Sequence, residues 1–237
     1  MVGDGFAGFA SENPDVITIS ELERRLASGG LQEELTLTEG QGISRERRRH
    51  LRECVARAQP RLHLQSLPEP AGPKLVHKRA PENVMISIPE RVGEDLYHAC
   101  LVVDDRCAEM SDHTTGQHLQ GMLLMEAGRQ MSLAVTEHYF LQQKPGRSNF
   151  FVINRFELEY LKFAFPVRTE MECQLRWAGR RRLSSNDVRI ALFQGGECIA
   201  DGCATFATYD ASMLRTFEAA KARELLTKLS STSCGNG

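Results

Sequence analysis

The feature that most constrains the fold is one long segment, residues 120–141, whose apolar residues do not keep to one side of a helix. Its central part, from Met122 to Val135, has the sequence MLLMEAGRQMSLAV. A helix on a protein surface keeps a polar face, whereas a helix that is apolar nearly all round is covered by the rest of its domain. The segment is too short in apolar residues to cross a bilayer, which takes ~20 of them. We therefore expect a buried central helix.

Segments with the character of β-strands lie on both sides of this helix. In 170–177 the apolar residues Met171, Cys173, Leu175 and Trp177 alternate with polar ones, which is typical of a strand with one buried face. Expected strands precede the helix at 83–89 and 95–103 and follow it at 149–153, 156–165, 170–177, 188–193 and 198–208. This order predicts an α+β fold in which an antiparallel sheet wraps one long helix.

The chain divides into three parts by pattern. Residues 1–70 alternate short helical patterns with loops, and we interpret them as an N-terminal helical extension that ends in a proline-rich linker, 67–73. Residues 71–210 form the main domain. Residues 211–237 are expected to form a C-terminal helix followed by a disordered polar tail.

Composition excludes several classes of function. The 29 basic and 31 acidic side chains leave a formal charge of -2, so nothing points to nucleic acid or to an anionic membrane. The 7 cysteines are odd in number and contain no CxxC pair, and the N-terminus lacks the features of a signal peptide. We expect reduced cysteines, a cytoplasmic location and no bound cofactor.

A carboxylate in the middle of the apolar helix needs a reason to be there. Burying Glu126 costs several kcal/mol unless it is paired or its pKa rises. Arg129 and Gln130, three and four positions later, share its helix face. Two interpretations follow: Glu126 is a general base whose ionisation Arg129 sets, or the two form an ion pair that fixes helix packing. The first also allows Arg129 to hold an anionic substrate.

The start of the helix offers a second kind of chemistry. Free N–H groups near Gly121 and Met122 would polarise a thioester carbonyl placed over them, and a glycine there would let a substrate approach. Turn formation is the alternative explanation for Gly116 and Gly121.

The loop before the helix contains two histidines beside an aspartate. Asp112 next to His113 would tune an imidazole for proton transfer, with His118 close by. A metal site is the rival interpretation, but this spacing is a poor ligand frame, so we predict no metal. Backbone hydrogen bonding is a third possibility for either histidine. Lys78, before the first strand, would neutralise a phosphate or simply be exposed.

The segment 112–130 resembles the loop-to-helix signature of hotdog-fold β-hydroxyacyl dehydratases. Its loop is one residue shorter and lacks their Phe-Pro and Pro-Gly steps. The residues that match that signature are His113, Gly116, Gly121, Glu126, Ala127 and Gln130.

A closer resemblance, over residues 75–210, is to the A-factor biosynthesis hotdog family. It rests on a His-Lys step, an Asn-Val step, Asp-His and Gly-Gln-His in the loop, and Glu-Ala-x-Arg-Gln on the helix. These motifs stand at His77-Lys78, Asn83-Val84, Asp112-His113, Gly116-Gln117-His118 and 126–130. The resemblance implies a hotdog fold. Well-known members of the family carry two hotdog repeats, whereas this chain has one motif copy. We therefore expect a homodimer that completes the pair.

The resemblance also implies a reaction. The family is associated with transfer of a β-ketoacyl group from acyl carrier protein, or from acyl-CoA, to a glycerol-type C3 phosphate in butenolide or butyrolactone signal synthesis. A dehydratase, a thioesterase and a non-catalytic acyl-binding protein are the alternatives. Glu126, His113 and Arg129 are then the candidate catalytic residues. The candidate substrate-binding residues are His77, Lys78, Asn83, Asp112, Gly116, Gln117, His118, Gly121, Met122 and Gln130.

Overall fold

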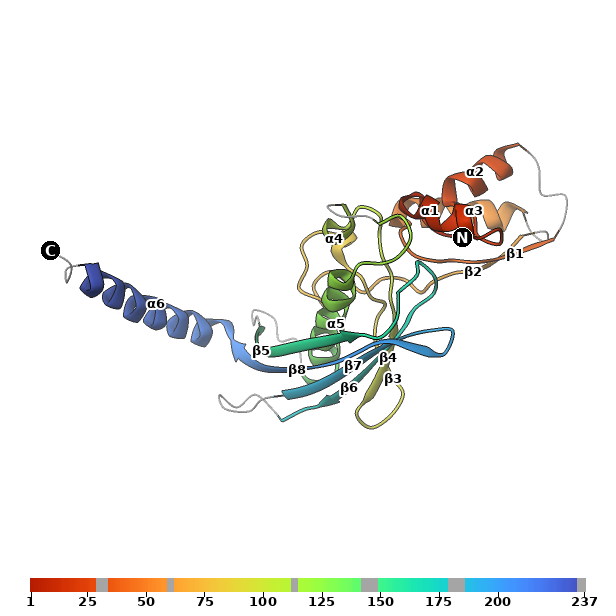
Figure 1. Cartoon of the computed structure of the whole chain (residues 1–237). Helices are drawn as coiled ribbons and strands as arrows, with labels where there is room; N and C mark the ends of the chain where they lie inside the picture. The colour runs from red at the N-terminus through yellow and green to blue at the C-terminus, as the bar shows by residue number, and fades with distance from the viewer. Residues whose placement is uncertain (29–33, 59–61, 112–114, 142–148, 179–185, 234–237) are drawn as a thin grey trace.

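The computed structural model describes residues 1–28, 34–58, 62–111, 115–141, 149–178 and 186–233. Six antiparallel strands form one sheet in the order β3-β4-β6-β7-β8-β5 (Figure 1). The strands are β3 (Glu90–Arg91), β4 (Leu96–Cys100), β5 (Asn149–Tyr160), β6 (Glu170–Arg176), β7 (Asn186–Gln194) and β8 (Glu197–Asp210). The predicted α+β class is confirmed, and the short β3 and the long β5 are the two edges of the sheet.

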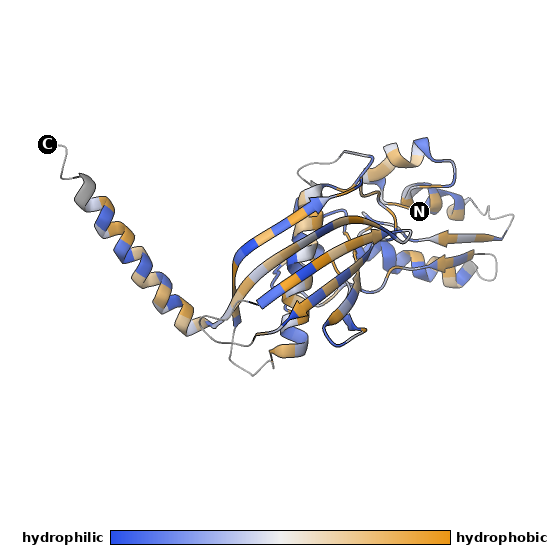
Figure 2. Ribbon diagram, turned by 60° about the horizontal axis from the view of Figure 1, so that its bottom comes forward, coloured by the Kyte–Doolittle hydropathy of each residue, from blue (hydrophilic) through white to orange (hydrophobic). Residues whose placement is uncertain are grey.

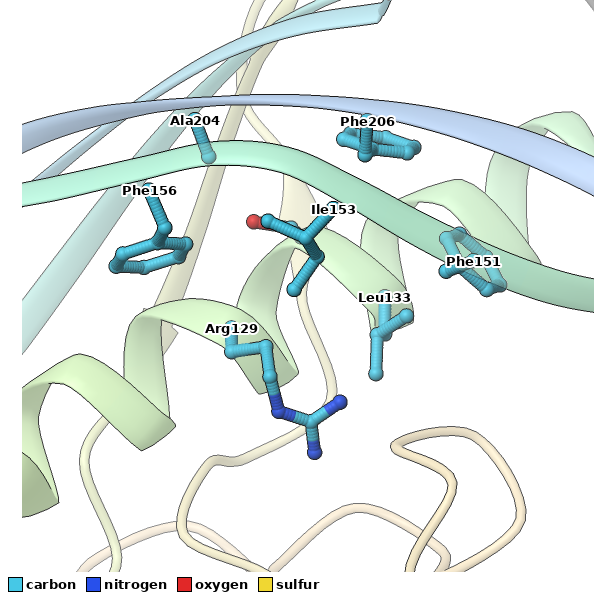
Figure 3. A pocket seen from close by; sticks show the side chains of 8 residues that line it. Arg129, Leu133, Phe151, Ile153, Phe156, Ala204 and Phe206 are labelled. Atoms are coloured by element: carbon cyan, nitrogen blue, oxygen red, sulfur yellow. The ribbon is translucent and has the colours of Figure 1, made fainter. Parts of the chain in front are cut away.

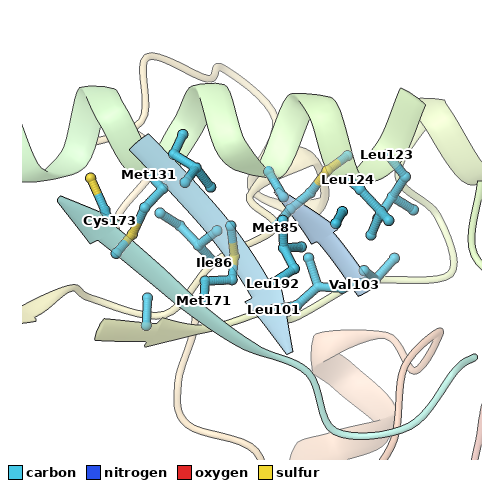
Figure 4. Close-up of a cluster of buried hydrophobic side chains, with 14 of the residues drawn as sticks. Met85, Ile86, Leu101, Val103, Leu123, Leu124, Met131, Met171, Cys173 and Leu192 are labelled. Carbon is cyan, nitrogen blue, oxygen red and sulfur yellow. The ribbon is translucent and has the colours of Figure 1, made fainter. Parts of the chain in front are cut away.

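The predicted central helix is α5, Gly121–Val135, which continues into a π-helical turn, Thr136–Phe140. It lies against one face of the sheet (Figure 1). Its buried side chains meet alternate residues of the strands, including Met171 and Cys173 of β6 and Leu192 of β7 (Figure 4). The expected sheet wrapped around one buried helix is therefore present, and the alternation in 170–177 identified the face that the helix covers.

Three of the expected strands differ from the structure. Residues 83–89 make only isolated bridges, Pro70 to Ser87 and Ile86 to Leu101, because a 3-10 turn at Pro81–Asn83 and Pro89 interrupt the run. The segments 149–153 and 156–165 instead form a single strand, β5, with a register shift between Ile153 and Arg155. A β-bulge of this kind changes the alternation of faces and hides the continuity of a strand in the sequence.

The N-terminal part contains more than helices and loops. Helices α1 (Ala7–Glu12), α2 (Ile19–Ala27) and α3 (Arg45–Ala58) pack with two parallel strands, β1 (Leu35–Thr38) and β2 (Leu62–Gln65). The proline-rich stretch is also packed, since Leu67 and Ala71 are buried and the Ala71 N–H donates to the Ile86 carbonyl. It lies against the sheet instead of serving as a free linker.

The arginines of α3 bind carboxylates of the same chain. Arg47 pairs with Asp4 and Glu23, and Arg52 pairs with Glu69. The pair of Arg48 and Glu39 is buried, with the Arg48 Nε 2.8 Å from the Glu39 Oε1. These three paired arginines hold the N-terminal elements together.

The C-terminal helix α6, Ala211–Ser233, leaves the sheet at the end of β8 and projects away from the domain (Figure 1). Polar and apolar residues alternate along its length without one continuous apolar face (Figure 2). Of the predicted polar tail, residues 230–233 continue this helix and 234–237 lie outside the described residues.

None of the described helices has the length and apolar character needed to span a membrane. The six described cysteines are free thiols, and Cys100, Cys107 and Cys173 are buried.

Removing one partner of the buried Arg48–Glu39 pair should destabilise the protein strongly. Arg48→Met leaves the Glu39 carboxylate buried beside a single remaining partner, the Leu67 N–H at 2.8 Å. We expect the free energy of unfolding in urea to fall by about 3–5 kcal/mol. The control is Arg49→Met on the exposed side of the same helix, which should change stability by less than about 0.5 kcal/mol. Equal effects of the two substitutions would contradict a structural role for the pair.

Candidate functional site

Glu126 is the centre of a polar cluster on the face of α5 that the sheet does not cover. Its Oε2 accepts from the Arg129 Nε at 2.7 Å, and its Oε1 accepts from the Arg129 Nη2 at 2.8 Å and the Gln130 Nε2 at 2.9 Å. The Lys78 Nζ lies 2.9 Å from the same Oε1. The structure thus brings together Glu126, Arg129, Gln130 and Lys78, four of the residues that the sequence predicted.

Gln130 joins the helix to the segment that precedes the sheet. It is fully buried, and its Oε1 accepts from the Met85 N–H while its Nε2 donates to the Asn83 carbonyl. Asn83 in turn accepts the Ala108 N–H with its side-chain oxygen. Gln130 and Asn83 therefore position the chain around Glu126, and their side-chain amides are occupied by these contacts.

The partners of Glu126 set its ionisation. Burial would raise the pKa of this carboxyl, but hydrogen bonds from Arg129, Lys78 and Gln130, together with the charge of Arg129, lower it to about 2. A general base works best when its pKa lies near the working pH. Of the two interpretations that the sequence left open, this geometry favours the ion pair that fixes Arg129 and Lys78.

Glu109 belongs to the same cluster, although the sequence analysis missed it. Its Oε1 lies 3.6 Å from the Lys78 Nζ, and its buried Oε2 has no hydrogen-bond partner among the described residues. Two carboxylates and two cations thus face each other here. No local pattern singles out Glu109, which stands in a short helix, α4 (Ala108–Ser111), just before the segment 112–130.

Part of the space beside the start of α5 is filled by a tyrosine ring. A Cβ on Gly121 would lie 2.7 Å from the Tyr160 Cζ, so this glycine makes room for the tyrosine ring of β5. Met122 is 64% exposed. Helix geometry leaves the first N–H groups of α5 without carbonyl acceptors inside the helix, so they remain available beside this methionine.

The loop residues lie further from Glu126. Gly116 has a φ of 73°, which supports the turn interpretation, and its carbonyl accepts the Phe9 N–H. Gln117 is exposed, and the His118 ring packs on Phe163 with ring centres 5.2 Å apart. Asp112 and His113, two of the predicted site residues, lie outside the described residues. In the part of the chain that the structure describes, no three His, Cys, Asp or Glu side chains gather closely enough to hold a metal ion.

A second buried carboxylate lies at the far end of the helix. The His77 Nε2 is 3.0 Å from Oε1 of Glu137, which is 5% exposed, and the Asn149 Nδ2 is 3.3 Å from Oε2 of the same residue. The sequence analysis proposed His77 but missed Glu137 and Asn149. Glu137 follows Glu126 by eleven positions, about three helical turns, so the spacing alone places both carboxylates on nearly the same helix face.

An apolar hollow separates α5 from the edge strand β5 (Figure 3). Arg129, Ser132 and Leu133 of the helix line one side. The sheet side is lined by Phe151, Ile153, Phe156, Ala204 and Phe206. The enclosed space, about 10 Å³, holds about one water, whereas pockets for small molecules have about 300–1,000 Å³. A larger groove, lined by Ser87, His98 and Glu170 among others, contains none of the predicted site residues.

The family of the chain follows from a match to a family model. The model of the A-factor biosynthesis hotdog domain matches residues 60–210. The chain belongs to this family. The match covers the sheet, α5 and both carboxylate clusters, so the contacts of Glu126 and Glu137 are contacts of an A-factor biosynthesis hotdog domain.

Several solved structures are similar to this hotdog domain at low sequence identity. A conserved protein from Pseudomonas aeruginosa is 21% identical with a TM-score of 0.37, over 51% of this chain and 86% of that one. A mutant thioesterase from the same organism is 18% identical with a TM-score of 0.38, over 53% and 81%. A thioesterase from Haemophilus influenzae is 17% identical with a TM-score of 0.38, over 53% and 78%. No curated protein sequence matches the chain.

The ion pairs of Glu126 make a prediction about stability and pH. Because the folded-state pKa is about 2, below the ordinary 4.5, the carboxylate stabilises the fold above pH 4.5, and this contribution is lost as the pH falls toward 2. Glu126→Gln should therefore lower the free energy of unfolding at pH 7 by about 3 kcal/mol and flatten its pH dependence between pH 5 and 2. Urea denaturation across this range measures both effects.

The same variant separates the two interpretations of Glu126. Unchanged stability together with a loss of turnover of about 10²-fold or more would show instead that the carboxylate is a general base.

Proposed function

We propose that the protein is an acyltransferase that moves a β-ketoacyl group from a carrier-protein thioester to the hydroxyl of a glycerol-type C3 phosphate. The observation that supports an acyl-thioester enzyme is the family match over residues 60–210. The acyl group would be held on phosphopantetheine of the carrier protein or of CoA, so the protein needs no cofactor of its own.

The site suits a thioester in two respects. The apolar hollow beside Leu133 and Phe151 would accept the start of an acyl chain, and the open N–H groups at the start of α5 would polarise a carbonyl. Arg129 uses two of its nitrogens on Glu126, and its third nitrogen, Nη1, which has no hydrogen-bond partner among the described residues, would bind an anionic group on the acceptor.

A thioesterase is the second candidate, because two of the similar structures bear that name in their descriptions. The two reactions differ only in whether a hydroxyl compound or water accepts the acyl group. The test is incubation with β-ketoacyl carrier protein, with and without dihydroxyacetone phosphate, followed by mass spectrometry. An ester that forms only with the C3 phosphate supports transfer. Free acid in both reactions supports hydrolysis, an enoyl product supports dehydration, and an unchanged bound thioester indicates acyl binding without catalysis.

We also propose that two copies pair through the free edge of β5. This strand pairs with β8 on one side only. Arg155 and Glu157 are exposed on it and flank Phe156, which lines the hollow. A two-fold axis at Phe156 would set Arg155 of each copy opposite Glu157 of the other and keep both helices on the same face of a continuous sheet. The partner would then enlarge the hollow, which is too small alone.

Charge reversal tests this register. Arg155→Glu places like charges opposite each other and should raise the dissociation constant of the dimer by about tenfold or more, as should Glu157→Arg. The double reversal restores opposite charges and should restore the dimer. Sedimentation velocity over a concentration series measures all four proteins. A wild-type protein that stays at the monomer mass of 26.5 kDa would contradict the proposal.

A further inference from the structure

The pair of His77 and Glu137 lies outside the Glu126 cluster and is more buried and more fully hydrogen-bonded than a surface contact. Glu137 is almost fully buried, and both of its oxygens are engaged, one by His77 and one by Asn149. The side chain of His77 is 32% exposed. Glu137 is therefore fixed, while the imidazole that it holds is open on its other side.

The backbone is unusual at both residues. His77 has a φ of 55°, a left-handed conformation that few residues other than glycine adopt. Glu137 stands in the π-helical turn at the end of α5, where the Leu141 N–H donates to the Thr136 carbonyl. Such features cost free energy and are found frequently at functional sites. Two of them meet in one side-chain pair, which indicates a functional role.

The histidine packs against a residue that lines the apolar hollow. Its ring lies edge-on to Phe151, with ring centres 5.3 Å apart, and Phe151 lines the hollow together with Leu133 and Arg129. A substrate that extends from the hollow past Phe151 would therefore reach the imidazole, with the guanidinium of Arg129 on another side of the hollow. Glu126 is unsuited to accept a proton there, because Arg129 and Lys78 hold its pKa at about 2.

We infer that His77 is the general base of the proposed acyl transfer and that Glu137 is its positioning residue. This inference rests on the proposed function. We assign the donor of this contact to Nε2–H of His77, which leaves the lone pair on Nδ1 for the acceptor hydroxyl. The arrangement follows the logic of catalytic triads, in which a carboxylate fixes the tautomer and orientation of a histidine.

The reaction balances without another reactant. The acceptor hydroxyl gives its proton to the His77 Nδ1, and its oxygen forms a bond to the thioester carbonyl carbon. The carbon–sulfur bond then breaks, and the thiolate of the carrier takes the proton back from the imidazolium. The products are an ester and a free thiol, and His77 returns to its neutral form.

The charged groups around His77 define what a pH profile would report. The carboxylate of Glu137 contacts the ring directly, and Lys78, the next residue, turns its ammonium toward Glu126 and Glu109. Removal of Glu137 would take this negative charge away from the ring. The acidic limb of the kcat/KM profile should then move to lower pH.

The experiment compares three variants of the full chain, with turnover normalised to folded protein by urea denaturation. His77→Asn removes the imidazole but keeps a residue that tolerates the left-handed backbone, and Glu137→Gln keeps the shape of the carboxylate. His138→Asn is the control, because this exposed histidine stands next to Glu137 and contacts Tyr139 instead. The assay measures ester formation from β-ketoacyl carrier protein and dihydroxyacetone phosphate.

We expect His77→Asn to lower turnover by about 10²-fold or more and to abolish the acidic limb, while His138→Asn behaves as wild type. Glu137→Gln should lower turnover and shift the limb. If both site variants unfold more easily but keep wild-type turnover and pH profile per folded molecule, the pair is structural and the inference is overturned, while the proposed function stands. An inactive wild-type protein would overturn the proposed function itself, and the inference with it.

Discussion

The structure depends on one constraint: a helix that is buried by its domain must find a partner for every polar side chain that it takes inside. Burying an amide or carboxylate without a hydrogen bond costs several kcal/mol. Glu126 and Gln130 of α5 and Glu137 of the π-helical turn that follows it meet this demand. Their partners come mainly from one segment, 77–85, which lies along the helix before the chain reaches the sheet.

Much of the fold could be predicted because its signals are local. An apolar segment around Glu126 identified the buried helix, and alternation from Met171 to Trp177 identified a strand with one buried face. The prediction for 83–89 was wrong in extent, because a 3-10 turn at Pro81–Asn83 and Pro89 interrupt the run and only 85–87 hydrogen-bond to 100–102. The Met85 N–H donates to Gln130 of the helix and not to a strand. Such a contact, over 45 positions in the chain, leaves no local pattern.

The candidate site was predicted in part for the same reason. Glu126, Arg129 and Gln130 stand within five positions, so helix geometry was enough to put them together, whereas Lys78 entered only through the family resemblance. Glu109 and Glu137 were missed because a carboxylate near the end of a helix is usually exposed, and only the long-range contacts with Lys78 and His77 reveal their burial. The eleven-residue interval between Glu126 and Glu137 was available in the sequence, since it returns to nearly the same face of the helix.

Glu126 of α5 and Glu137 of the π-helical turn have different roles because their partners differ. Glu126 faces two cations, Arg129 and Lys78, which stabilise its charged form and make proton transfer to it unfavourable near neutral pH. Glu137 faces an imidazole and an amide, neither of which is a permanent cation. A carboxylate paired with permanent cations fixes the positions of those side chains. A carboxylate paired with an imidazole can instead support a ring that gains and loses a proton during a reaction. The neutral balance of the Glu126 cluster therefore suits the fixing of a substrate, and the proton chemistry falls to the other end of the helix.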